Sequence, residues 1–146
     1  MEQATVETAK GYQTKITTER HTWHGDMPES AGGTGTAANP EELLLGALGS
    51  CTTMTLHMYA NRKGWDLQRV EIDLSLEKVR ADQVADYDGD ARYVNTIQQS
   101  LRFHGDLDDE QHARLMEIAG RCPVHRIMEG PLLLSEVAAE AVADEA

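Results

Sequence analysis

The sequence is poor in cysteine, in basic residues and in long apolar runs. Two cysteines in 146 residues are too few for the disulfide scaffold of a small secreted protein. The 13 Lys and Arg against 25 Asp and Glu give a net charge of −12, which argues against binding nucleic-acid phosphates or anionic membranes. No apolar run approaches the roughly 20 residues that cross a bilayer, and MEQATVETAK has no signal-peptide core. We therefore expect a soluble, cytoplasmic protein.

The length fits one domain, residues 1–146, large enough to fold without covalent staples. Rough alternation over residues 3–24 predicts two or three strands in a meander. Clearer alternation predicts a half-buried strand at 67–80 and a partner strand at 91–103. Clusters of Gly, Ser, Pro and Asp between these segments predict loops at 25–38 and 81–90.

The strongest helix signal covers residues 39–63. Asn39 is a good N-cap, Pro40 suits the first helical position, and Gly64 supplies a stop. Apolar residues occur on more than one face of this helix, so we expect it to be buried.

Shorter elements follow the second long strand. Asp106 or Asp108 could cap a helix that runs through Ile118, and another helix opens at Pro123. The segment 131–142, PLLLSEVAAEAV, could be a final strand or a helical tail. Strands, a central helix, a hairpin and further helices together indicate an α+β domain.

The two cysteines have different local settings. Cys51 lies on the apolar stripe of the long helix, where a buried small hydrophobe is the simplest interpretation. Cys122 precedes Pro123 at the start of a helix, where backbone N–H groups and the helix dipole would stabilise a thiolate. Arg121 and Arg126 would act in the same direction, although Cys122 could equally be a structural cap.

A metal site is weakly indicated. The sequence has no CxxC motif, and His21 and His24 would point to opposite faces of an extended strand. A structural zinc site that uses the thiols and a histidine stays as an alternative.

Residues 33–65, GTGTAANPEELLLGALGSCTTMTLHMYANRKGW, together with CPVHRIM at 122–128, resemble the OsmC/Ohr family. This family comprises the osmotically inducible protein C and organic hydroperoxide resistance proteins. The shared pattern is a Gly-rich lead-in, NPEEL, a Cys ten residues after its first Glu, and a distant Cys-Pro. The resemblance is closer to the OsmC-like branch than to either founding subfamily.

The resemblance implies a thiol peroxidase that reduces organic hydroperoxides, with Cys51 as the peroxidatic thiol and Cys122 as the resolving one. It implies that Glu41 orients an active-site arginine. Arg20 is the only arginine before Cys51 and is our candidate, with Lys10 or His21 as substitutes. Helix-cap electrostatics alone would instead nominate Cys122 as the nucleophile.

The resemblance also implies a curved antiparallel sheet around a long buried central helix, in an intertwined homodimer. A dithiol, typically a lipoyl group, would recycle the cysteines, and no metal or organic cofactor is needed. The rival function is a non-catalytic OsmC-like protein that binds a small hydrophobic ligand.

Helix geometry gives a separate argument for a dimer. Glu41 and Cys51 are about 15 Å apart along one helix axis, which is too far for contact within a chain. Two antiparallel copies crossing near residue 46 would bring Glu41 of one copy toward Cys51 of the other in an isologous contact. The small residues Gly46, Ala47, Gly49 and Ser50 would allow a close approach, or they could simply face a sheet of the same chain.

Overall fold

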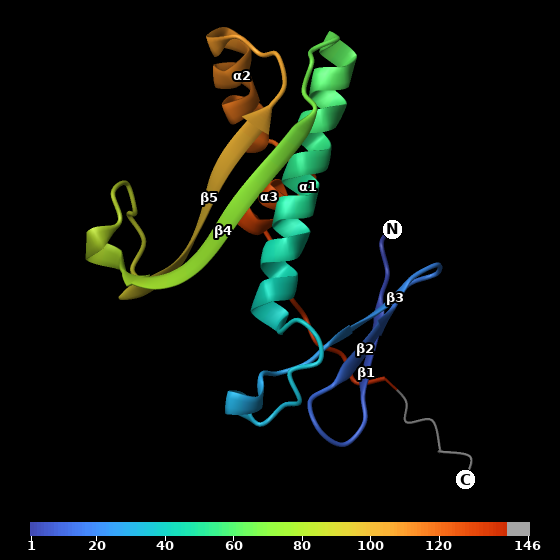
Figure 1. Ribbon diagram of the computed structural model, residues 1–146. Coiled ribbons are helices and arrows are strands. Elements are labelled where there is room, and N and C mark those ends of the chain that lie inside the picture. The colour runs from blue at the N-terminus through green and yellow to red at the C-terminus, as the bar shows by residue number, and fades with distance from the viewer. Residues whose placement is uncertain (140–146) are drawn as a thin grey trace.

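The computed structural model describes residues 1–139. It begins with a three-stranded antiparallel sheet, as the alternation over residues 3–24 predicts. β1 (Thr5–Thr8), β2 (Thr14–Thr17) and β3 (Thr22–Gly25) lie in the order β1-β2-β3, with Ile16 of β2 opposite Val6 and Trp23. In Figure 1 this sheet lies near the end at which the long helix begins.

The long helix α1 (Pro40–Lys63) has the predicted bounds because its ends are fixed locally. Asn39 and Glu42 form a capping box, in which each side chain accepts a hydrogen bond from the other residue's backbone N–H at 2.9 Å. Gly64 ends the helix in the left-handed conformation, at φ 69°. The loop before α1 contains the short 3₁₀ helix η1 (Glu29–Ala31).

β4 (Arg69–Arg80) and β5 (Tyr93–His104) form a long antiparallel hairpin, which lies along α1 in Figure 1. Apolar residues of β4 are half-buried on one face, as predicted, and Leu74 is paired with Gln99. The connection contains a second 3₁₀ helix, η2 (Ala81–Gln83).

α2 (Asp109–Ala119) is capped by Asp108, one of the two predicted candidates, and α3 (Pro123–Glu129) starts after Cys122 as predicted. The hydrophobic core forms where α2 packs against the C-terminal half of α1. Its buried members are Leu56, Tyr59, Ala60, Leu67, Leu115, Ile118 and Ala119.

Three expectations need correction. We expected one curved sheet, but the described strands form two separate sheets, β1-β2-β3 and β4-β5. No strand of the first sheet is hydrogen-bonded to a described strand of the second. α1 is buried on one face only, since Leu44, Met54 and Met58 are 42%, 63% and 72% exposed. The described part of the last segment, residues 131–139, is neither strand nor helix, and residues 140–142 lie outside the described chain.

Across residues 1–139 we find no helix with the length and apolar character needed to span a bilayer.

Candidate active site

Cys122 is held at the start of α3. Its φ and ψ of −65° and 147° are those of an N-cap residue, and its Sγ accepts a hydrogen bond from the backbone N–H of His125 at 3.2 Å. The side chain is fully buried. Sulfur therefore takes the place that a Ser or Asp oxygen usually takes at a helix start.

Cys51 faces the same turn of α3 from the middle of α1. The backbone N–H of Val124 donates to its Sγ at 3.5 Å, and the residue is half-buried. Both cysteines are free thiols. The fold thus brings together two cysteines from distant parts of the chain at the first turn of one short helix.

The surroundings of Cys51 work against its ionisation in the single chain. Burial raises the pKa of the Cys51 thiol, and the neighbouring Cys122 raises it further through a hydrogen bond and through charge. The N–H of Val124 acts in the opposite direction because it favours the thiolate. No positive group of residues 1–139 is among the causes that shift the pKa of Cys51, so its activation calls for one from outside the described chain.

A buried hydroxyl connects the cysteines to the β4–β5 hairpin. Thr52 Oγ1 lies 3.1 Å from Gln99 Oε1 of β5 and 3.7 Å from Cys122 Sγ. Neither Thr52 nor Gln99 is indicated as a site residue by the sequence alone. The sequence offers no specific signal, because Thr52 is one of several polar residues around Cys51, with Ser50 and Thr53 on either side.

Glu41 and Arg20 are not brought to the cysteines within one chain. Glu41 is exposed in the first turn of α1, about 15 Å along the axis from Cys51. Arg20 lies in the turn between β2 and β3 and has no ion-pair partner among residues 1–139.

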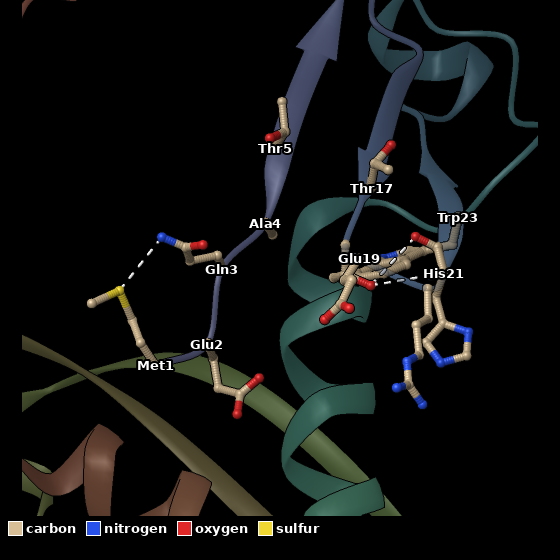
Figure 2. Close-up of a pocket in the computed structure, with 11 residues that line it drawn as sticks. Met1, Glu2, Gln3, Ala4, Thr5, Thr17, Glu19, His21 and Trp23 are labelled. Atoms are coloured by element: carbon tan, nitrogen blue, oxygen red, sulfur yellow. Dashed lines mark hydrogen bonds between the residues drawn. The ribbon is translucent and has the colours of Figure 1, made fainter.

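Arg20 lines a pocket of about 620 Å³ with His21, Trp23 and the first five residues, and neither cysteine lines this pocket. Figure 2 shows the pocket, with Met1 to Thr5 on one side and Glu19, His21 and Trp23 on the other. Lys10, the other substitute, is exposed in the turn between β1 and β2.

Comparison with known proteins identifies the family to which this cysteine arrangement belongs. A family model described as OsmC-like protein matches residues 33–135, the range that holds both cysteines and the helices that carry them. The chain belongs to the OsmC-like family. No curated protein matches its sequence.

Solved structures of the OsmC fold resemble this chain over most of its length. The OsmC-like protein of Mycoplasma pneumoniae is 17% identical, with a TM-score of 0.69 over 90% of this chain and 89% of that one. The organic hydroperoxide resistance protein OsmC of Legionella pneumophila is 18% identical, with a TM-score of 0.63 over 90% and 91%. The organic hydroperoxide resistance protein OhrB of Bacillus subtilis is 20% identical, with a TM-score of 0.59 over 90% and 93%. At identities this low, the structural likeness shows a shared fold and nothing further.

Two hollows are lined by residues of the cysteine-bearing helices of this OsmC-like chain, although neither cysteine lines them. A mainly apolar groove of about 730 Å³ lies between the N-terminal sheet and the start of α1 and extends to Ser50, beside Cys51. A smaller pocket of about 270 Å³ is lined by Leu48, Gln99, His125 and Met128, among others. Either could admit a small, largely apolar molecule.

The HTWHGD segment has a structural role. Asp26 is buried, and its carboxylate accepts hydrogen bonds from the N–H groups of Met27, Thr34 and Thr36 and from both threonine hydroxyls. These bonds, with that of the Thr34 hydroxyl the largest cause, hold the pKa of Asp26 well below its ordinary range. Within residues 1–139 no group of three potential metal-ligating side chains gathers around His21, His24 or elsewhere.

Proposed function

We propose that this protein is a cytoplasmic thiol peroxidase that reduces organic hydroperoxides. The observation that carries the proposal is the meeting of Cys51 and Cys122 at the first turn of α3, one thiol half-buried and the other fully buried. A half-buried thiol can meet a substrate, and a buried neighbour can resolve the oxidised product without competing for substrate.

The chemistry needs no group beyond thiols. The Cys51 thiolate attacks the terminal oxygen of the hydroperoxide, an S–O bond forms, the O–O bond breaks, and the alkoxide takes a proton to leave as an alcohol. Cys122 then attacks the sulfenic sulfur, an S–S bond forms, the S–O bond breaks, and hydroxide leaves as water with the Cys122 proton. A dithiol supplies two electrons and two protons to restore both thiols and becomes a disulfide.

Relatives support this reaction class. The Legionella pneumophila and Bacillus subtilis proteins that share the fold are organic hydroperoxide resistance proteins. The match to the OsmC-like family model, residues 33–135, includes both cysteines.

The proposed active unit is a homodimer in which Glu41 and Arg20 reach Cys51 from the partner copy. The exposed face of α1 carries Leu44, Met54 and Met58, and a Cβ added at Gly46 would meet no atom within 4 Å. An antiparallel second α1 on this face would cover the apolar side chains and bring its Glu41 toward Cys51. A guanidinium held by Glu41 through a charge-assisted pair would favour the Cys51 thiolate.

A binding protein is the second candidate. The raised pKa of Cys51 and the remote position of Arg20 disfavour catalysis by one chain. The apolar groove beside Ser50 has room for a small hydrophobic ligand. If the protein only binds a ligand, its cysteines take no part in catalysis and organic hydroperoxides are not reduced.

Single-turnover chemistry on two matched variants tests the assignment of roles. Cys51→Ser is expected to leave the peroxide unreacted, whereas Cys122→Ser is expected to reduce one equivalent and to hold a sulfenic acid on Cys51. Trapping with dimedone followed by peptide mass spectrometry locates the oxidised sulfur. Dimedone on Cys122 of the Cys51→Ser protein would reverse the roles, and no adduct in either variant would favour the binding protein.

A further inference from the structure

Thr52 is a fully buried hydroxyl directly beside the proposed redox pair. Its Oγ1 lies 3.0 Å from the Leu48 carbonyl oxygen, 3.1 Å from Gln99 Oε1 and 3.7 Å from Cys122 Sγ. A hydroxyl has one proton, so it can donate to only one of these three acceptors at a time.

The three acceptors differ in how many other hydrogen-bond donors they have when the Thr52 proton is directed elsewhere. The Leu48 carbonyl lies inside α1, where the helical pattern already gives it a donor. Gln99 is half-buried and lines the small pocket, so its amide can turn and present Nε2 instead of Oε1. Cys122 Sγ is fully buried, and its other donors are the N–H of His125 and the thiol of Cys51 while Cys51 is protonated.

We propose that Thr52 is a positioning residue that donates its hydrogen bond to Cys122 Sγ whenever that sulfur carries negative charge. Gln99 would then donate from Nε2 to Thr52 Oγ1, which makes a continuous chain from β5 to the sulfur. Hydrogen bonds aligned in this way strengthen one another in a buried setting. The inference rests on the proposed redox pairing of Cys51 and Cys122.

The negative charge arises on Cys122 at two moments of the proposed cycle. It arises when Cys122 attacks the oxidised Cys51, and again when a dithiol opens the disulfide at the more exposed Cys51 and releases Cys122. Among residues 1–139 the Thr52 hydroxyl has a hydrogen bond to Cys122 Sγ and none to Cys51 Sγ, so its direct effect is on Cys122. The same hydrogen bond is present to the reduced sulfur and is weakened when that sulfur is bonded in the disulfide. It therefore stabilises the reduced pair relative to the disulfide and raises the reduction potential.

The test is the redox equilibrium of the pair in the full-length protein, measured with graded mixtures of reduced and oxidised dithiothreitol and a count of free thiols. Thr52→Val keeps the shape and removes the hydroxyl. We expect it to favour the disulfide about ten-fold, which lowers the potential by about 30 mV for two electrons. Thr52→Ser keeps the hydroxyl and is expected to retain the parent potential.

Gln99→Leu tests the same chain from β5 without altering α1, and we expect a smaller shift in the same direction. An unchanged potential in both Thr52→Val and Gln99→Leu would overturn the inference. So would a Thr52→Ser shift as large as that of Thr52→Val, because packing of the methyl group would then be responsible. This equilibrium involves no peroxide, so a protein that fails to consume peroxide can still confirm the role of Thr52.

Discussion

The backbone N–H of Val124 lies 3.5 Å from Sγ of Cys51 and directs the first turn of α3 at the middle of α1. Because Cys122 caps the same turn, both sulfurs are held by backbone N–H groups of one short helix. A helix start favours negative charge, so this turn suits a pair of thiols that alternate between thiolate and disulfide.

Oxidation should join the two cysteines within one chain. A disulfide requires Cα atoms usually 4.4–6.8 Å apart, and the shared turn of α3 brings the two residues into neighbouring positions. After one equivalent of cumene hydroperoxide, non-reducing peptide mapping is expected to find Cys51 linked to Cys122. A disulfide between chains, or sulfinic acid on Cys51 with no disulfide, would rule out Cys122 as the resolving thiol.

The pH dependence of Cys51 reactivity should depend on its neighbour. Burial and Cys122 both raise the pKa of Cys51 within one chain, whereas a partner guanidinium would lower it in the proposed dimer. In a chain kept monomeric by Gly46→Leu, the thiolate should therefore appear at higher pH in the folded state than in the unfolded one. Cys122→Ala removes the second cause, so the midpoint of Cys51 alkylation by iodoacetamide should move to lower pH.

The control for this titration is the same variant unfolded in guanidinium, where no neighbour acts on the thiol. Folded midpoints that are the same with and without Cys122 would show that the two thiols do not interact.

Asp26 should make the fold sensitive to acid. Its pKa is lowered in the folded state, so its contribution to stability is present above the unfolded carboxyl value and is lost as pH falls below about 4. Asp26→Asn should therefore have a lower thermal midpoint at pH 7 and a weaker loss of stability between pH 5 and pH 2. Thermal unfolding monitored by circular dichroism across this range measures both. A parallel shift of the two curves would mean that Asp26 is not the titrating group.

Two glycines on α1 separate a dimer contact from a contact within the chain. Gly46 is open within one chain, so Gly46→Leu should fold and raise helix propensity by up to about 1 kcal/mol, yet it should weaken a dimer that crosses at this point. Gly49 is the matched control, because a Cβ there would lie 2.9 Å from Leu74 Cδ1. Gly49→Leu should lower the free energy of unfolding by about 1–3 kcal/mol through overpacking.

Sedimentation at micromolar concentration distinguishes these outcomes. We expect a dimer for the parent chain and a monomer for Gly46→Leu. A parent protein that sediments as a monomer would remove both the interface and the cross-chain positions of Glu41 and Arg20.

Features with local causes could be predicted from the sequence. The ends of α1 follow from Asn39, Pro40 and Gly64, and the β4–β5 hairpin follows from alternation along both strands. The N-cap position of Cys122 follows from Pro123. In each case residues adjacent in sequence decide the structure.

Features that depend on distant residues could not be predicted in this way. Nothing in the sequence near Thr52 indicates that Gln99 of β5 and Cys122 of α3 lie beside its hydroxyl. The sequence around His21 and His24 argued against a metal site but did not indicate what Asp26 does, and Asp26 accepts hydrogen bonds from backbone groups eight and ten residues further along the loop. Arg20 was selected as the only arginine before Cys51, and its place in the β2–β3 turn leaves its role dependent on a second copy.

The central claim is that the cysteine pair turns over organic hydroperoxide, and steady-state consumption of cumene hydroperoxide with dihydrolipoamide as the reductant tests it most directly. The account predicts many turnovers by the parent protein, none by Cys51→Ser, and no sustained turnover by Cys122→Ser with the same dithiol. Parent and Cys51→Ser proteins that consume peroxide at the same background rate would contradict the claim.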